Sequence, residues 1–215
     1  MHLVSTIAIA LLATVGLSEI ASAAEHAPTA PHSSAATQEL ATTREALRDL
    51  WLGHIFSVRE VVRAVADKDA ALAKVAEGRA VENARSIAAA IEPFYGKPAS
   101  QQLFDLLAGH YTAIKDHAGA TTAGNTAEAK KAFERLVANA NEIAGFLSAA
   151  NPHLPKNTLS SMLLAHGGHH VKQNQQIAKA DWQGEARTWD EIKTHIYAIS
   201  DALAGALAKQ FPEQF

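Results

Sequence analysis

The chain has 215 residues, which is enough for one ordinary domain with a buried core and too few for two comfortable ones. Its residues are 48% hydrophobic but only 6% aromatic, and Ala and Leu dominate the apolar share, a balance that favours helices over strands. The formal net charge is -3 and Lys and Arg do not cluster, so the composition excludes the basic surface of a nucleic-acid-binding protein.

The first 23 residues are predicted to be a signal peptide. An apolar run of suitable length spans Leu3–Leu17, and the small residues Ala21 and Ala23 have the spacing of a cleavage site. The run is short for a membrane span, but no Lys or Arg precedes it, so an uncleaved anchor is the alternative. We expect cleavage after Ala23 and a periplasmic or secreted protein with no integral membrane span. Because the chain has no cysteine, its fold would be stabilised by the hydrophobic core without disulfides.

Residues 24–37 are rich in Pro, Ser and Ala, and we expect them to form a disordered leader. Residues 38–215 are predicted to be a single domain, because every long segment carries apolar residues three or four positions apart. Helix breakers separate these segments at residues 92–98, 119–126, 151–158 and 181–184. Thr126 and Thr158 stand where helix N-caps are expected. The pattern predicts an all-α protein.

The chain contains an internal repeat. His54, His110 and His166 are equally spaced. The segment Leu-Trp-Leu-Gly-His, which ends at His54, is similar to Leu-Leu-Ala-Gly-His, which ends at His110. The segment VENARSIA at 81–88 precedes VANANEIA at 137–144 by the same interval. We therefore expect a six-helix bundle made of three antiparallel helical hairpins of about 56 residues each.

The core-facing histidine of each repeat is followed by another polar residue at a constant separation. These pairs are His54 with Asn83, His110 with Asn139, and His166 with His195. The midpoint of each pair falls on a predicted turn, so both members lie at the same height in an antiparallel hairpin, about 20 Å from the turn. Each hairpin is therefore expected to hold one buried polar contact.

Histidines on apolar helix faces point to a transition-metal site. Imidazole is a ligand for zinc, copper and nickel, and a buried imidazole needs a partner. In the HGGHH segment at 166–170 the outer histidines are spaced i, i+4, as are Glu191 and His195. If the three hairpins pack around one centre, the candidate ligands are His54, His110, His166, His170 and His195.

The same residues also fit a metal-free architecture. A buried His facing a buried Asn satisfies both by hydrogen bonding, so Asn83 and Asn139 would form a structural polar layer that sets the register between helices. If the hairpins stack in a row, neighbouring helices lie about 8–10 Å apart and the histidines cannot share a metal. The two glycines of HGGHH also favour a frayed turn with His169 and His170 in solvent.

No catalytic residue is predicted, because the chain lacks a Gly-rich phosphate loop, a cysteine nucleophile and the paired carboxylates of di-iron bundles. Arg59, at the edge of the core stripe, either anchors an anionic ligand or forms an interhelical ion pair. The sequence favours an exported, non-catalytic binding protein whose His-rich core or HGGHH turn holds a transition metal. The alternative is a metal-free structural or interaction module of the cell envelope with a protein partner.

Several segments resemble a family of small all-helical bacterial proteins of unassigned function. They are LWLGHIFSVREVV, IEPFYG, LLAGHYTAI, NANEIAGFLSAANP and ALAKQFP, and the similarity covers nearly the whole chain after Thr37. The residues that match the family pattern are His54, Arg59, Asn83, His110, Asn139 and His166. His169, His170 and His195 depart from it. The resemblance implies the helical fold and no particular chemistry.

Overall fold

The computed structural model describes residues 32–215 and shows side chains from Thr37 onward; the predicted signal peptide, residues 1–23, lies outside the described residues. The described part is all α and contains no strand, which confirms the predicted fold class. Its six helices are α1 (His32–Ala66), α2 (Ala70–Ala90), α3 (Glu92–Thr122), α4 (Thr126–Ala150), α5 (Lys156–Ala178) and α6 (Trp182–Gln210), followed by a single 3-10 turn, η1 (Pro212–Gln214). None of the described helices has the length and apolar character needed to cross a membrane.

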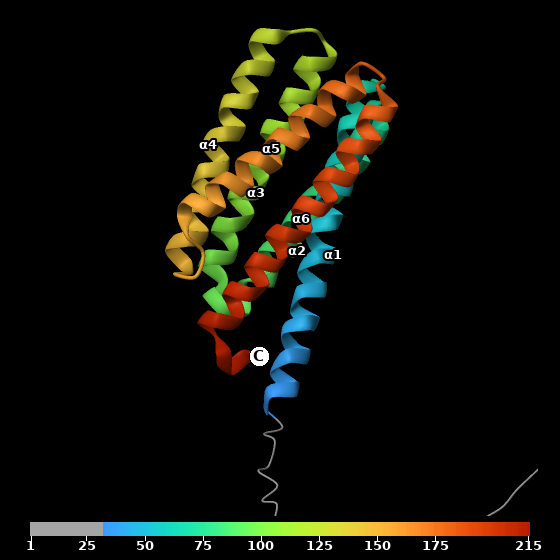
Figure 1. The fold of residues 1–215 in the computed structure, drawn as a ribbon. Helices are drawn as coiled ribbons and strands as arrows, with labels where there is room; N and C mark the ends of the chain where they lie inside the picture. The colour runs from blue at the N-terminus through green and yellow to red at the C-terminus, as the bar shows by residue number, and fades with distance from the viewer. Residues whose placement is uncertain (1–31) are drawn as a thin grey trace, which may run out of the picture. The chain divides into compact units, whose positions relative to one another are not determined.

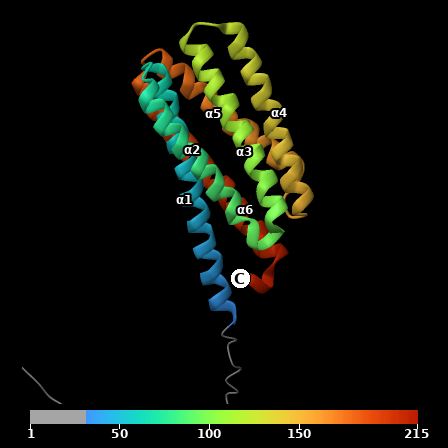
Figure 2. The same cartoon turned by 180° about the vertical axis from the view of Figure 1, so that it is seen from behind.

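The odd-numbered helices form the inside of the bundle. α1, α3 and α5 contact one another, and each even-numbered helix packs across two of them: α2 on α1 and α3, α4 on α3 and α5, and α6 on α5 and α1. Consecutive helices run in opposite directions, and α6 returns to lie beside α1 (Figure 1, Figure 2). Side chains that point inward from α1, α3 and α5 therefore face a common centre.

The turns that follow α1, α3 and α5 share one backbone geometry. In each, a single residue takes the left-handed conformation, with φ of 57° at Lys68, 69° at Gly124 and 54° at Ala180. The next N–H bonds back to the carbonyl five residues earlier, at 3.0, 2.8 and 2.9 Å in chain order, which closes the preceding helix. For a residue with a Cβ, such as Lys68 or Ala180, the left-handed conformation costs about 1 kcal/mol. The hydrogen bonds of the turn offset this cost.

The residue after each left-handed position caps the next helix. Its side-chain oxygen accepts a hydrogen bond from the backbone N–H three residues on, and the capping residues are Asp69, Asn125 and Asp181. The prediction that Thr126 is a cap is therefore wrong by one residue, since it is the first residue of α4. Thr158 lies inside α5, which begins after Pro155 without a side-chain cap.

The helical part of the chain begins earlier than predicted. α1 begins at His32, so residues 32–37 of the predicted leader are helical; this stretch contains no proline, and Ala is the best helix former. The predicted break at 92–98 is present. α2 ends at Ala90, and α3 begins with one helical turn, in which Pro93 is tolerated, before Gly96, whose φ of 79° and ψ of 168° kink the helix.

Along each inner helix, a polar stretch separates two apolar ones. The residues before the histidines belong to one core cluster, which includes Trp51 on α1, Leu107 on α3 and Leu163 on α5. The residues after them belong to a second cluster, which includes Val58, Ile114 and Ile177. The histidines are therefore enclosed between two apolar layers, in the interior of the bundle.

Candidate metal centre

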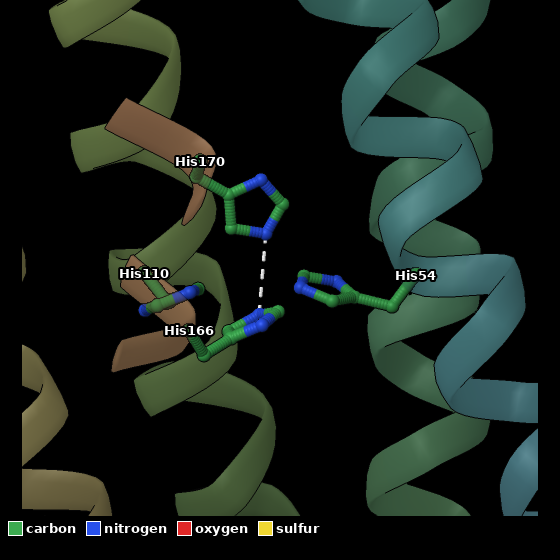
Figure 3. A group of neighbouring side chains, drawn as sticks. All are labelled: His54, His110, His166 and His170. Carbon is green, nitrogen blue, oxygen red and sulfur yellow. Dashed lines mark hydrogen bonds between the residues drawn. The ribbon is translucent and has the colours of Figure 1, made fainter. Parts of the chain in front are cut away.

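Four histidines from the three inner helices gather between the two apolar layers. His54 comes from α1, His110 from α3, and His166 and His170 from α5. Their side-chain exposures are 5%, 2%, 1% and 0% in that order. One ligand nitrogen from each ring lies within 4.8 Å of the nitrogens offered by the other three. Figure 3 shows the His54 ring reaching across from α1 toward the three other rings.

The spacing of these nitrogens approaches that of a four-coordinate metal. In a tetrahedral zinc site with Zn–N bonds of about 2.0–2.1 Å, neighbouring nitrogens are about 3.3 Å apart. The Nε2 atoms of His166 and His170 are already 3.2 Å apart. The ring centroids of His54 lie 5.6 to 6.0 Å from those of its three neighbours, so small side-chain rotations would close the remaining gaps.

The pair on α5 owes its geometry to helix periodicity. Residues four apart lie on one face of a helix, and the His166 and His170 rings are 4.6 Å apart in an edge-on arrangement. The prediction of an HGGHH turn is wrong, because this segment lies within α5. Burial explains part of the difference: His166, Gly167 and His170 are all buried, and the packing of a buried face supplies most of the stability of a helix in a protein.

A hydrogen-bonded chain fixes the tautomer of His110. The Asn139 amide nitrogen donates to the Leu106 carbonyl at 2.9 Å, which turns the Asn139 Oδ1 toward the histidine. That oxygen can only accept, so His110 Nδ1 carries a proton and donates it over 3.1 Å. The Nε2 of His110 therefore keeps its lone pair, and it has no hydrogen-bond partner. Metal-binding histidines are oriented in this way by a carbonyl or carboxylate behind them.

The side-chain amides of Asn83 and Asn139 explain the glycine that precedes the histidine in LWLGH and in LLAGH. Asn83 donates to the Leu50 carbonyl at 3.0 Å, and its path crosses the α1 backbone at Gly53. A Cβ at Gly53 would lie 2.8 Å from the Asn83 amide nitrogen, and a Cβ at Gly109 would lie 3.2 Å from that of Asn139. The glycine thus leaves room for the amide that lies against it.

The third hairpin makes the corresponding contact with an imidazole. His195 Nε2 donates to the Met162 carbonyl at 2.8 Å. Its ring stacks beside that of His166, with centroids 6.4 Å apart, and it stays outside the group of four converging nitrogens. Of the five predicted ligands, the structure brings four together and places His195 next to them.

Burial keeps the four imidazoles neutral. The pKa of His54 is lowered to about 3, first by desolvation and then by the neighbouring His110. Desolvation also lowers the pKa of His110 to about 4, although its bond to Asn139 acts in the opposite direction. The pKa values of His166 and His170 lie well below the usual range for the same reason. Neutral imidazole is the form that binds a metal.

Each ring of the cluster has a buried nitrogen without a protein partner. These atoms are His54 Nε2, His110 Nε2, His166 Nδ1 and His170 Nδ1. A buried polar atom that loses its hydrogen bonds costs about 1–3 kcal/mol. In His54 and His110 the unpartnered atom is Nε2, whose lone pair a metal ion could use, whereas in His166 and His170 it is Nδ1 and the two Nε2 atoms bond to each other.

A second buried polar group lies farther along α5, and most of it was missed by sequence reasoning. Arg59 forms the predicted interhelical ion pair, with its guanidinium 2.5 and 2.6 Å from the two carboxylate oxygens of Glu185. Gln173 donates to the same carboxylate at 2.9 Å, and Asn174 donates to the Ile114 carbonyl at 3.2 Å.

Helix periodicity could have found two of these residues. Gln173 and Asn174 follow His170 by three and four positions, and so lie on its face of the helix. Glu185 gave no such signal, because an acid in the first turn of a helix is usually exposed to solvent. Its exposure here is only 3%.

No protein-family model, curated protein or solved structure matches this chain.

Proposed function

We propose that this protein binds a transition-metal ion through His54, His110, His166 and His170. The observation that carries the proposal is the convergence of four buried nitrogens, one from each of these rings, within 4.8 Å of one another. The orienting contact behind His110 and the unpartnered Nε2 atoms of His54 and His110 support it. Imidazole ligands suit zinc, copper and nickel, whereas calcium and magnesium prefer oxygen.

The proposed role is binding rather than catalysis. Structural metal sites are closed by four protein ligands, while catalytic sites keep one position open for water or substrate. Four histidines, all 5% exposed or less, supply a complete tetrahedral set and leave no solvent-facing position. The ion would tie α1, α3 and α5 together and add its binding free energy to the stability of the bundle.

We also propose that the bundle consists of three copies of one helical hairpin. Support comes from features that recur with the period of the sequence repeat: the left-handed turn residues, the caps that follow them and the polar contacts to Leu50, Leu106 and Met162. The contacts among the odd-numbered helices fit an arrangement of the copies around one centre. Under this proposal, His54, His110 and His166 occupy equivalent positions in the three copies.

Export is the third part of the proposal, supported by the apolar run Leu3–Leu17 and the small residues Ala21 and Ala23. Fractionation of a native host, followed by intact-mass measurement, tests it. The expected product is a periplasmic or secreted chain that begins at Ala24. A full-length chain attached to membranes would contradict cleavage after Ala23.

The contacts of Asn83, Asn139 and His195 favour one alternative. Each donates to a carbonyl 33 residues earlier and joins the two helices of a hairpin. In a metal-free envelope module these contacts would be purely architectural, and the histidines would complete a buried polar layer. That alternative requires no metal in the purified protein, which makes the two functions separable by one measurement.

Elemental analysis of untagged protein decides between them. The wild type is purified, incubated with zinc, copper or nickel, and freed of unbound metal, in parallel with His166→Ala and the matched control His153→Ala. His153 is exposed in the segment between α4 and α5, so its loss tests for binding by surface histidines. We expect about one ion per chain in the wild type and the control, and a large loss in His166→Ala.

Absence of metal from the wild type after all three incubations would overturn the proposal. Circular dichroism checks that His166→Ala still folds. If it does not, His54→Gln removes a ligand from a different helix while keeping a polar side chain of similar length. Equal metal content in the wild type and a folded His54→Gln protein would also contradict the site.

A further inference from the structure

A line of metal-ligating side chains leads from the buried cluster to the surface between α5 and α6. Glu191 stands at the outer end, with its side chain 47% exposed and its Oε2 atom 3.8 Å from Nδ1 of His169, whose side chain is 23% exposed. The His169 ring lies 5.4 Å from that of His195, and the His195 ring lies 6.4 Å from that of the fully enclosed His166. Ligands thus follow one another from solvent to the proposed metal centre.

The tautomer of His195 suits this position. Its Nε2 donates to the Met162 carbonyl, which can only accept, so the proton is on Nε2. Nδ1 of the neutral ring therefore keeps its lone pair and is free to bind a metal. A carboxylate and two imidazoles that are only partly buried would hold a hydrated divalent ion loosely, because water can still occupy the remaining positions.

The other two hairpins lack this line of ligands. At the equivalent positions of the repeat, Asn83 and Asn139 stand where the third hairpin has His195, and Arg79 and Arg135 stand where it has Glu191. An amide is a poor ligand for these metals. Each hairpin has an outer carboxylate in an ion pair, but only Glu191 of the α5–α6 hairpin lies beside an imidazole, that of His169.

The difference arises from a reversed ion pair. In the first two hairpins an acid on the odd-numbered helix pairs with an arginine on the even-numbered one, in Glu60–Arg79 at 2.9 Å and Asp116–Arg135 at 2.7 Å. In the third hairpin the charges are exchanged: Lys172 on α5 pairs with Glu191 on α6 at 2.7 Å. The exchange keeps the cross-link between helices and places the carboxylate beside His169.

We propose that Glu191, His169 and His195 form an entry site that takes up a divalent transition-metal ion from solvent and passes it to His166 in the buried cluster. This inference rests on the proposed metal-binding function. Each transfer replaces one nitrogen or oxygen ligand by the next, with no change in the oxidation state of the ion. The entry site lowers the barrier for uptake and release alike, so it sets rates more than the final affinity.

Stopped-flow mixing with Co²⁺, whose absorption reports coordination by nitrogen, tests the proposal. One variant is His195→Asn, which gives the third hairpin the amide of the other two. A second is Lys172→Glu combined with Glu191→Arg, which restores their charge order. We expect uptake and release to slow together by at least about tenfold in both, since charge at a binding cleft changes on-rates by this much or more.

The matched control exchanges the charges of the first hairpin, with Glu60→Arg combined with Arg79→Glu, and is expected to leave both rates unchanged. Unaltered rates in both test variants would overturn the entry site, as would a slowing of equal size in the control. Loss of bound Co²⁺ at equilibrium in His195→Asn would also overturn it, because His195 would then be a ligand of the final site. A wild type that binds no metal at all would instead refute the proposed function itself.

Discussion

Two groups of buried polar side chains lie along α5, and they differ in how they are satisfied. In the first, His54, His110, His166 and His170 are uncharged, and each ring has a nitrogen without a partner. In the second, the buried Glu185 carboxylate receives two hydrogen bonds from Arg59 and one from Gln173. The guanidinium also lies over the Trp189 ring, 4.9 Å from its centroid.

The ion pair is part of the architecture of the fold, whereas the histidines have the capacity to bind a ligand. A buried charge without a counter-charge would be prohibitively expensive, so the ion pair has to be complete in the folded protein itself. A neutral imidazole can lack a hydrogen-bond partner at a smaller cost, and the unpartnered Nε2 atoms of His54 and His110 then have lone pairs available for a metal. On this basis, changes in the first group should affect metal affinity, while changes in the second should affect stability alone.

Replacing His54 by Leu should have the largest effect, and it should fall on metal binding. The change removes one of four ligands and also a buried nitrogen that lacks a partner. We expect zinc affinity to fall about 1,000-fold, equivalent to about 4 kcal/mol, with the metal-free protein as stable as the wild type or more so. Competition with a chromophoric chelator measures the first, and urea unfolding in EDTA the second. A fall below about tenfold would place His54 outside the site.

Acid should destabilise the metal-free protein through the same four histidines. Their folded pKa values lie below the unfolded value of about 6.5, so the unfolded chain binds more protons. The free energy of unfolding therefore falls as the pH drops below 6.5 and keeps falling until the folded pKa values, about 3 for His54 and about 4 for His110, are reached.

Between pH 7 and pH 5.5 the expected loss in the free energy of unfolding is about 1 kcal/mol per histidine, or about 2 to 3 kcal/mol for His54 and His110 together. His166 and His170 act in the same direction. Urea unfolding at a series of pH values in EDTA measures the slope, and the His54→Leu protein should have a shallower one. A free energy of unfolding that is constant over this range would show that the histidines are not desolvated as the structure has them.

Replacing Glu185 by Gln tests the second group. The change leaves the Arg59 guanidinium without its counter-charge, and because that side chain is still 23% exposed we expect a loss of about 2 kcal/mol, less than for a fully buried pair. Zinc affinity should be unchanged. The matched control is Asp116→Asn in the exposed pair with Arg135, which should cost about 0.5 kcal/mol or less. If Glu185→Gln weakened zinc binding strongly, the two groups would not be independent.

The sequence predicted the positions of the histidines along each helix but not how α1, α3 and α5 meet. The equal spacing of His54, His110 and His166 places them at one height whether the hairpins stack in a row or surround a centre. The deciding contact is between α6 and α1, which join distant parts of the chain. No local pattern encodes such a contact, so the sequence left open both a shared site and a set of separate polar contacts.

The errors in the site have local causes. HGGHH was assigned to a turn because each glycine costs a helix about 1 kcal/mol. The segment is helical all the same, and His166, Gly167 and His170 are packed in the interior, where tertiary contacts supply most of the stability of a helix. Glu185 was missed because its partner, Arg59, lies 126 residues away. Periodicity shows which face of a helix is buried; it does not show which distant side chain will satisfy a charge there.

The smallest predicted effect tests whether the amide contacts behind the histidines are architectural. Gly53→Ala adds a Cβ that would lie 2.8 Å from the Asn83 amide nitrogen, whereas Gly168→Ala, on α5 near the histidines, meets no atom within 4 Å. Alanine in place of glycine stabilises a helix by about 1 kcal/mol where space allows. We therefore expect Gly168→Ala to raise the free energy of unfolding by about that much, and Gly53→Ala to lower it by about 1 kcal/mol, because the bond from Asn83 to Leu50 is displaced.

Urea unfolding in EDTA compares the two variants. Equal stabilisation by both would show that the Asn83 contact contributes nothing to the packing of α2 on α1. Since Asn83 itself is not among the converging ligands, a stability loss without a loss of zinc affinity would assign the repeated amide to the framework and leave metal binding to the imidazoles.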